Sequence, residues 1–320
     1  MKAAMYSKNG SPEVLEYRDA PDPTLGPDQV LIRVKAISIE GGDLLNRRLV
    51  PPPSFPHIGG YQAAGIIEAT GSDVTGLSVG QHVVAFNWAG SHAELFCVPT
   101  HYVYSLPESL DFELASTIPV PFGTADDSLF EFGGLAAGET VLIQGAAGGV
   151  GIAAVQLAGR AGATVIGTSS SDERLSRLRS LGMDHGINYR SEDIAERALE
   201  LTGGKGVDLV VDLAGGNAVD DLFKAVRYRG RIAVVGASSG DLPSFGFFDI
   251  IRKSLTLAGV SFGREMHLPR VHRMLDGLID EVATGKLHMP IDRTFPLSEA
   301  AAAHWYAEEA HPFGRVLMIP

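Results

Sequence analysis

Cysteine is almost missing from this sequence: among its 320 residues, only Cys97 carries a thiol. A disulfide within one chain is therefore impossible, which fits a protein kept in a reducing compartment. The opening residues, MKAAMYSKNGSPEVLEY, contain no apolar core of the kind that marks a secretory signal. No uninterrupted apolar stretch reaches the length that a membrane-spanning helix needs. We therefore expect a cytoplasmic protein without a membrane partner.

Positive charge is also scarce, because 26 Lys and Arg residues face 38 Asp and Glu residues, for a net charge of −12. Binding a nucleic-acid backbone requires clustered basic side chains, so nucleic acid is not an expected partner. Hydrophobic residues make up 45% of the chain and charged residues 20%, as is typical of globular proteins. The length is sufficient for about two domains.

The first 118 residues are rich in predicted β-strands. Short segments of alternating polarity are separated there by Gly, Pro and Asp turns, which predicts a compact sheet or barrel. The clearest segments are QVLIRVKAI (29–37), AAGIIEAT (63–70), VGQHVVAF (79–86) and HAELFCVP (92–99).

From about residue 139 to 260, apolar strands alternate with amphipathic helices, which predicts a parallel, doubly wound sheet. The predicted strands are 140–144, 164–168, 186–188, 207–213, 231–236 and 254–260. The predicted helices between them are GVGIAAVQLAGRAG, DERLSRLRSLG, SEDIAERALELTG, NAVDDLFKAVRYRG and FFDIIRKS.

The C-terminal segment contains two predicted helices, 268–285 and 297–310, and a closing strand, 314–320. It is too short for a domain of its own, so we expect it to complete the first domain. The sequence thus predicts an α/β protein with one domain formed by 1–118 and 262–320 and a second formed by 119–261.

The stretch VLIQGAAGGVG (141–151) places a cluster of small residues between a predicted strand and a predicted helix. A pyrophosphate can approach the free N–H groups of a helix N-terminus only where no side chain intervenes. A second strand follows within about 30 residues, which is the context of a dinucleotide-binding turn. The alternative is a tight strand–helix turn that holds no ligand.

The end of the second strand indicates which dinucleotide fits. NAD-binding folds usually place an acidic residue there to bind the ribose 2′-hydroxyl. This chain has Ser169, Ser170 and Ser171 instead, followed by Arg174. Hydroxyls and a guanidinium favour a 2′-phosphate, and therefore NADPH. The alternative is a solvated helix start in which Ser171 or Asp172 is only an N-cap.

The sequence resembles the zinc-independent quinone oxidoreductases (zeta-crystallin-like) of the medium-chain dehydrogenase/reductase superfamily. The resemblance is carried by MKAAMYSKNGSPEVLEY, VLIRVKAISI, FPHIGGYQAAGIIEATGSDV, VLIQGAAGGVGIAAVQLAGRAGATVIGT, INYRSED and GRVLMIP. It implies a GroES-like first domain, a Rossmann second domain with NADPH in the cleft between them, and a homodimer joined near 254–261.

Family members hold the 2′-phosphate with a lysine near the position of Arg174 and a tyrosine at that of Tyr189. Residues 236–238 are implied at the nicotinamide side. The predicted cofactor-binding residues are Gly145, Ala146, Ala147, Gly148, Gly149, Val150, Gly151, Thr168, Ser169, Ser170, Arg174, Tyr189, Gly236, Ala237, Ser238 and Thr124.

Zinc-dependent members of the superfamily bind catalytic zinc through a Cys and a His, and the matching positions here are Ile39 and Tyr61. Neither is a usual zinc ligand, and the single cysteine excludes a four-cysteine structural site. Glu40 and Asp43 lie nearby, but no His or Cys spacing supports them as ligands. We therefore expect no metal.

The substrate-side residues depart from the family pattern. Quinone-reducing relatives often have asparagine at the position of Glu40 and tyrosines in the following loop, where this chain has Leu45 and Val50. An anionic Glu40 is a poor partner for a forming enolate unless burial protonates it. The predicted catalytic or cleft residues are Glu40, Asn46, Tyr61, Trp88 and Arg264. Packing is an equal alternative for Tyr61 and Trp88, and a surface ion pair is one for Arg264.

The sequence thus predicts an NADPH-dependent enzyme that transfers hydride to a small, electron-poor acceptor, either a quinone or an α,β-unsaturated carbonyl. One alternative is an enoyl-thioester reductase, in which Arg47 and Arg48 would form a basic rim for the substrate. Another is a catalytically quiet NADPH-binding sensor or structural protein.

Overall fold

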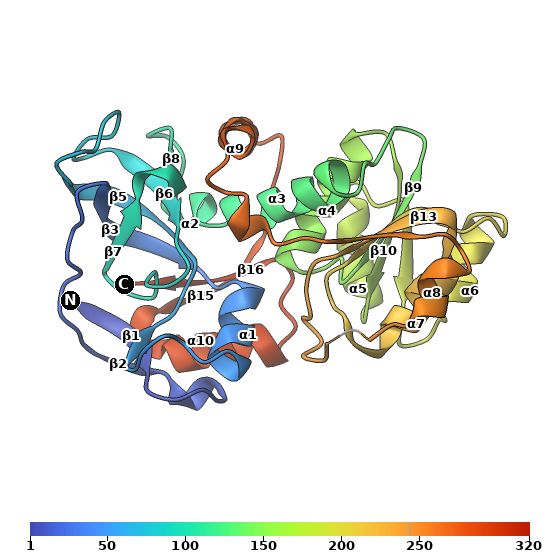
Figure 1. The fold of residues 1–320 in the computed structure, drawn as a ribbon, viewed down its shortest axis with the longest axis horizontal. Coiled ribbons are helices and arrows are strands. Elements are labelled where there is room, and N and C mark those ends of the chain that lie inside the picture. The colour runs from blue at the N-terminus through green and yellow to red at the C-terminus, as the bar shows by residue number, and fades with distance from the viewer. Residues whose placement is uncertain (243) are drawn as a thin grey trace. The chain divides into compact units, whose positions relative to one another are not determined.

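The computed structural model describes residues 1–242 and 244–320. The chain forms two compact units (Figure 1). The first unit comprises Met1–Val120 and Gly263–Pro320, and the second comprises Pro121–Phe262. The domain boundaries expected from the sequence, 118/119 and 261/262, differ from these by at most two residues.

A parallel sheet of six strands forms the centre of the second unit, in the order β11-β10-β9-β12-β13-β14. Renumbered along the chain, this is the order 3-2-1-4-5-6 of a doubly wound dinucleotide-binding fold. The predicted Rossmann sheet is confirmed. Its strands are β9 (Thr140–Gln144), β10 (Thr164–Ser169), β11 (His185–Asn188), β12 (Val207–Asp212), β13 (Val226–Val234) and β14 (Thr256–Gly259).

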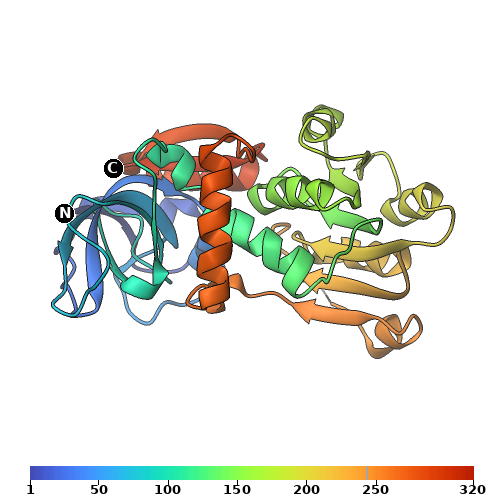
Figure 2. The ribbon, with the colours of Figure 1, turned by 90° about the horizontal axis from the view of Figure 1, so that it is seen from above.

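Helices precede and connect the strands of this sheet and pack along it, as Figure 2 shows. Continuous apolar strands such as β9 and β12 are buried on both faces, which is why they lack alternation. The helices are α3 (Pro119–Asp126), which continues as a π-helix (Asp127–Glu131), α4 (Gly149–Arg160), α5 (Asp172–Arg179), α6 (Ile194–Leu201), α7 (Val219–Ala225) and α8 (Phe247–Ile251).

The helix expected over NAVDDLFKAVRYRG is wrong in its second half. Helix α7 ends at Ala225, and Val226 already belongs to strand β13, where it pairs with Val207. Val226 is 1% exposed, so its β-branched side chain is buried in the sheet. Sheet pairing and burial outweigh the helical spacing at this point.

The first unit contains two sheets. One has the strand order β15-β16-β3-β5-β6-β8 with β7 also paired to β3, and the smaller one has the order β2-β1-β4. Their strands are β1 (Lys2–Tyr6), β2 (Glu16–Asp19), β3 (Gln29–Ser38), β4 (His57–Ile58), β5 (Gln62–Thr70), β6 (His82–Phe86), β7 (Leu95–Pro99), β8 (Val103–Ser105), β15 (Ile291–Pro296) and β16 (Arg315–Ile319). Helices α2 (Phe112–Ala115), α9 (Pro269–Ala283) and α10 (Ala300–Glu309) also belong to this unit.

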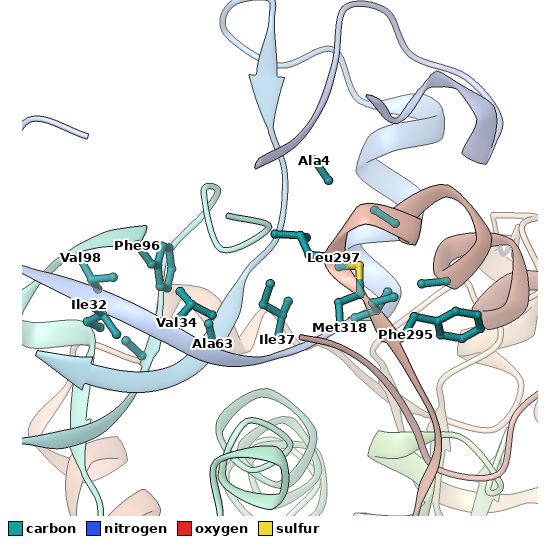
Figure 3. Close-up of a cluster of buried hydrophobic side chains, with 14 of the residues drawn as sticks. Ala4, Ile32, Val34, Ile37, Ala63, Phe96, Val98, Phe295, Leu297 and Met318 are labelled. Carbon is teal, nitrogen blue, oxygen red and sulfur yellow. The ribbon is translucent and has the colours of Figure 1, made fainter. Parts of the chain in front are cut away.

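The C-terminal segment shares a hydrophobic core with the N-terminal strands. Strand β16 runs antiparallel to β3, with Leu317 opposite Ser38 and Met318 opposite Ile37. Figure 3 shows Ile37 of β3 facing a group that includes Leu297 and Met318. The first unit therefore requires both ends of the chain.

The loop expected after Glu40, which contains Leu45 and Val50, begins instead with helix α1 (Gly41–Leu49). The helix was not predicted because two glycines at its start and three prolines after its end are typical of a loop. Asp43, three residues after the N-cap Glu40, accepts a hydrogen bond from the Glu40 backbone N–H at 2.8 Å. In return, the Asp43 N–H donates to the Glu40 carbonyl at 3.0 Å. This reciprocal contact between the N-cap and the third helical residue is the local signal that identifies the helix.

Among the residues that the structure describes, no helix has the length and apolar character required to cross a membrane. The cytoplasmic location expected from the sequence stays a prediction.

Candidate functional site

The glycine-rich turn connects β9 to α4 and lies where the sheet order changes direction. Gly145 has φ +75°, a left-handed conformation that glycine adopts at no steric cost. Its N–H donates to Thr168 Oγ1 at 3.2 Å, and the Ala146 N–H donates to the Thr168 carbonyl at 3.1 Å. Ligands bind at this edge in doubly wound sheets, beyond the carboxyl ends of the strands.

The turn itself forms a close-packed cradle that fits a dinucleotide pyrophosphate. A Cβ atom on Gly151 would lie 2.4 Å from the Gly145 oxygen and 2.6 Å from Ala146 Cα, so only glycine allows this approach. The N-cap Gly148 is exposed, and its nearest neighbour for an added Cβ is the Gly145 oxygen at 3.6 Å. Backbone N–H groups at the start of α4 are therefore accessible to an anion.

The end of β10 presents hydroxyls and one guanidinium. Arg174 Nη2 donates to Ser170 Oγ at 3.2 Å, which brings these two predicted residues together. Ser171 is the N-cap of α5, and its hydroxyl accepts from the Arg174 N–H at 3.5 Å. This agrees with the alternative that Ser171 is a helix N-cap. Tyr189 is 50% exposed, and its N–H donates to the Ser169 carbonyl at 3.2 Å.

The neighbouring carboxylate of Asp172 is engaged elsewhere: its Oδ1 accepts from Asn188 Nδ2 at 2.9 Å. Thus Ser170 contacts the Arg174 guanidinium, whereas Asp172, the acidic residue closest to it in the sequence, is hydrogen-bonded to the Asn188 amide. A 2′-phosphate has suitable partners in Ser170 and Arg174.

Asp212, at the end of β12, was not predicted from the sequence. Its Oδ1 accepts the N–H groups of Gly215 at 2.8 Å and Ala214 at 3.1 Å, which shapes the turn beside the glycine cradle. Burial raises the pKa of this carboxyl. The signal available in the sequence was an acidic residue directly after a buried strand at the sheet's carboxyl edge.

The remaining predicted cofactor residues lie in two places. The Gly236 N–H donates to the Asp212 carbonyl at 3.2 Å, and the exposed Ser238 donates its N–H to the Leu213 carbonyl at 3.3 Å. This sets residues 236–238 beside the turn after β12. Thr124 is 8% exposed within α3, where its carbonyl accepts from Ser128 Oγ at 2.6 Å.

In the first unit, three predicted catalytic residues meet. Asn46 Nδ2 of α1 donates to Tyr61 Oη at 2.6 Å, and the ring of Tyr61 lies edge-on to Trp88 with centroids 6.3 Å apart. All three line a cavity. Burial raises the pKa of Tyr61 to about 12, with the Asp43 carboxylate adding to the effect. Tyr61 is therefore a protonated hydroxyl whose own hydrogen is free for a further acceptor.

Glu40 lies behind this group, with only 2% of its surface exposed. Its Oε1 contacts Arg315 Nη2 at 2.5 Å and accepts from Gln62 Nε2 at 2.6 Å and Ser38 Oγ at 3.0 Å. Burial raises the pKa of Glu40 to about 7, and the Arg315 guanidinium opposes that effect. The carboxylate predicted at the substrate is thus directed into an ion pair with the last strand.

Arg264 is exposed in a short 3₁₀ turn (Phe262–Arg264). The preceding Gly263 packs against Trp88, because a Cβ there would lie 2.8 Å from Trp88 Cη2. Arg264 therefore directly follows the residue that packs against the indole. Within the described residues, no group of three or more His, Cys, Asp or Glu side chains is arranged to hold a metal ion.

Comparison with known proteins identifies relatives of both units. Residues 26–108 match the family model described as the alcohol dehydrogenase GroES-like domain, and residues 149–277 match the model described as zinc-binding dehydrogenase. The GroES-like fold expected for the first domain is confirmed.

Three full-length relatives illustrate the similarity. The quinone oxidoreductase of Pseudomonas aeruginosa is 33% identical over 323 residues, which cover 100% of this chain and 99% of that protein. The 2-haloacrylate reductase of a Burkholderia species is also 33% identical, over 99% of this chain and 98% of that protein. The crystal structure of Escherichia coli quinone oxidoreductase complexed with NADPH superimposes with a TM-score of 0.95 at 29% identity and covers 100% of both chains.

Two glycine substitutions separate packing from ligand binding at the turn. We expect Gly151→Ala to lower the free energy of unfolding by about 1–3 kcal/mol, because its Cβ meets backbone atoms. Gly148→Ala should change stability by less than about 1 kcal/mol but weaken NADPH binding at least about tenfold, since its Cβ projects where the pyrophosphate approaches. Urea unfolding and fluorescence titration measure both quantities. Unchanged NADPH affinity in Gly148→Ala contradicts the assignment.

The raised pKa of Glu40 predicts a pH dependence of stability. The folded carboxyl, with a pKa of about 7 against 4.5 for the ordinary group, binds a proton more tightly than the unfolded one. The contribution of Glu40 to the free energy of unfolding is therefore fully present below pH 4.5 and is lost as the pH rises through 7. We expect the unfolding free energy of the parent protein, relative to Glu40→Gln, to fall by about 1–3 kcal/mol between pH 5 and pH 8. A difference that rises with pH would show a lowered pKa instead.

Proposed function

The chain belongs to the quinone oxidoreductase family of the medium-chain dehydrogenase/reductase superfamily, and from this membership we propose that it transfers hydride from NADPH to a quinone or an α,β-unsaturated carbonyl without zinc. It is an NADPH-dependent oxidoreductase of small molecules. The acceptor class and the independence from zinc are the parts that we propose.

The contact between Arg174 and Ser170 carries the proposal on the cofactor side. Among dinucleotides, only NADP carries a phosphate on the adenosine ribose, and a guanidinium paired with a hydroxyl suits that dianion. The Asp172 carboxylate accepts a hydrogen bond from Asn188, which directs that oxygen toward the amide. Gly145, Gly148 and Gly151 supply the pyrophosphate cradle that the same cofactor needs.

NADPH, when bound, supplies a hydride to the acceptor. Reduction of a conjugated carbonyl places negative charge on its oxygen, and this charge needs a donor. Asn46 donates to Tyr61 Oη, so the Tyr61 hydrogen is directed away from Asn46 and is available to that oxygen. A tyrosine with a pKa of about 12 stays protonated near neutral pH, which makes it a stable hydrogen-bond donor.

The donor atoms near Tyr61 support chemistry without a metal. Ile39 has no donor atom, and Tyr61 is engaged by Asn46, so the two positions that match zinc ligands in relatives provide no thiolate or imidazole. In this proposal, Tyr61 replaces the Lewis acid as the group that stabilises the developing oxyanion.

The aromatic surface near Tyr61 favours a flat, conjugated acceptor. The Trp88 indole is 46% exposed and lies edge-on to Tyr61 and to Phe86, at 6.3 and 5.3 Å between centroids. An exposed ring of this kind can stack on a planar, electron-poor molecule. Quinones and conjugated carbonyls share that character, so both acceptor classes stay within the proposal.

NADPH oxidation by the purified protein tests the function directly. The acceptors are a para-quinone, an ortho-quinone, a simple enone and an enoyl-CoA, with NADH replacing NADPH as control. We expect turnover with a quinone or the enone and a clear preference for NADPH. Turnover with enoyl-CoA alone would indicate a thioester reductase, and tight NADPH binding without turnover would indicate a quiet binding protein.

Reversing the charge of Arg174 should change cofactor preference. In Arg174→Glu, we expect NADPH to bind about 10- to 100-fold more weakly, while NADH affinity changes little, because only NADPH loses an ionic partner. Arg177→Glu, one turn along α5, is the charge-matched control. Equal losses for both cofactors would remove the 2′-phosphate assignment.

Removing the Tyr61 hydroxyl should slow hydride transfer. Loss of one oxyanion donor typically lowers kcat about 100-fold or more, so we expect an effect of that order in Tyr61→Phe. The NADPH dissociation constant should stay unchanged, because the hydroxyl belongs to the acceptor side. Stopped-flow oxidation of bound NADPH measures the step, and a kcat within about threefold of the parent would refute the role of Tyr61.

We also propose that the protein is a homodimer. Strand β14 is the last in its sheet and pairs on one side with β13. The adjoining helix α8 exposes Phe247, Phe248 and Ile251, at 70%, 61% and 51%. An exposed strand edge beside apolar side chains is a surface suited to pairing.

Sedimentation should give twice the 33.9 kDa chain mass, and the double substitution of Phe247 and Phe248 by Lys should give the monomer.

A further inference from the structure

A second group of polar side chains is buried next to Asn46 and Tyr61, and no role assigned so far uses it. Asp43 and Arg47 come from α1, His92 from the segment before β7, and His304 from α10. Their exposed fractions are 4% for Asp43 and 1% for each of the other three. Burying so many polar groups is costly unless each finds a partner.

Each of the three guanidinium nitrogens of Arg47 has a partner. Its Nη2 pairs with Glu308 at 2.6 Å, its Nε donates to the Gly10 carbonyl at 3.1 Å, and its Nη1 contacts His304 Nδ1 at 2.9 Å. A guanidinium has only donors, so Nδ1 of His304 is the acceptor in this contact. The Arg47 charge is therefore balanced by Glu308.

The contact with Arg47 determines the state of His304. Burial, together with His92 and the Arg47 charge, holds the pKa of His304 well below its usual value, so the ring is neutral. Since Nδ1 accepts, the single ring hydrogen is on Nε2. Nε2 has no hydrogen-bond partner within the described residues and is a donor without an acceptor.

Asp43 presents the complementary group. Its Oδ2 accepts from the Glu40 backbone, whereas Oδ1 has no hydrogen-bond partner among the residues described. His92 Nε2 lies 3.7 Å from Asp43 Oδ2, beyond hydrogen-bond distance. Both ring nitrogens of His92 are also buried without a hydrogen bond inside the described part of the chain.

These groups share one small cavity. It is the cavity already described as lined by Asn46, Tyr61 and Trp88, it has a volume of about 20 Å³, and Asp43, His92 and His304 line it as well. One buried water needs about 10–15 Å³ on this measure and usually makes about three hydrogen bonds to otherwise unsatisfied polar groups. The volume and the unpartnered atoms therefore suit a single water molecule.

The chemistry of the lining also selects water over an ion. A cation cannot accept a hydrogen bond from His304 Nε2–H, and an anion would be repelled by the Asp43 carboxylate. A water molecule accepts from the first and donates to the second, and its other hydrogen is available to His92.

We propose that one water molecule occupies this cavity and bridges His304 Nε2 to Asp43 Oδ1, and that Asp43 and His304 are thereby positioning residues for Asn46 and Tyr61. The positioning part rests on the proposed function of Tyr61. Asp43, Asn46 and Arg47 lie at i, i+3 and i+4, so they share one face of α1. The bridge holds this face against α10, and the same face directs Asn46 to the Tyr61 hydroxyl.

A crystal structure of the full chain, at a resolution that shows ordered water, tests the bridge. We expect a water oxygen within about 3.2 Å of both His304 Nε2 and Asp43 Oδ1. An empty cavity, a direct bond between the two side chains, or an ion in place of water would overturn the proposal.

Two variants of similar size test the positioning role. In His304→Gln, the amide oxygen can accept from Arg47 and the amide nitrogen can donate to the water, so we expect the 2.6 Å Asn46–Tyr61 contact to persist and kcat to stay within about threefold. His304→Met removes both functions. There we expect the contact to lengthen and kcat to fall about ten- to a hundredfold, with the KM for NADPH unchanged.

Thermal unfolding establishes whether both variants are folded. If His304→Met does not fold, Asp43→Asn replaces it as the test variant. Equal losses in the Gln and Met variants, or an unchanged Asn46–Tyr61 distance in the Met variant, would contradict the positioning role. The crystallographic distances do not depend on turnover. A parent protein that reduces no acceptor would therefore count against the proposed function and leave the water bridge to be decided by the structures.

Discussion

The buried ion pair between Glu40 and Arg315 is the interaction on which the substrate side of the first unit depends. It joins the N-cap of α1 to the last strand, β16, although the two residues lie 275 positions apart in the 320-residue chain. Buried pairs add little net stability, but removing one partner leaves an uncompensated charge and costs about 3–5 kcal/mol. Gln62 extends the network, because its amide donates to Glu40 and to the Ser116 carbonyl. The start of α1, and with it Asn46, is thus held by residues from three distant segments.

The charged side chains near the two proposed sites are partnered differently in the two units. In the second unit, the proposed phosphate site is formed by backbone N–H groups at the start of α4, and the nearby carboxylates of Asp172 and Asp212 accept hydrogen bonds from Asn188 and Gly215. In a chain with a net charge of −12, these hydrogen bonds fix the directions of the two carboxylates, and the Arg174 guanidinium supplies positive charge beside the proposed phosphate site. In the first unit, Glu40 pairs with Arg315 and Glu308 pairs with Arg47, and the neutral Tyr61 hydroxyl is the group proposed to face the substrate.

This division matches what hydride transfer to a conjugated carbonyl requires. The cofactor brings the reducing equivalent, so the protein must bind phosphates firmly and stabilise one developing oxyanion. Glu40 was a difficulty in the sequence, since a free carboxylate would oppose that oxyanion. Its burial against Arg315 removes the difficulty, because the carboxylate is directed to a guanidinium rather than to the position that Tyr61 can reach.

Local features were sufficient to predict the Rossmann sheet, the glycine turn and the cluster of Ser170 and Arg174. Strand runs, turn glycines and helix starts are properties of neighbouring residues, so they can be identified before folding is known. Helix α1 was missed because its glycines and the following prolines resemble a loop, and the end of α7 was misplaced because pairing of Val226 with Val207 decided it.

The partners of Glu40, the bond between Asn46 and Tyr61, and the group formed by Asp43, His92 and His304 could not be predicted in this way. Their members come from segments separated by tens to hundreds of residues, and no local pattern specifies which of them meet. The sequence by itself therefore determined the elements of the sheet and the cofactor turn. The tertiary structure decided which polar side chains share a buried space, because only packing brings distant donors and acceptors within the short range of a hydrogen bond.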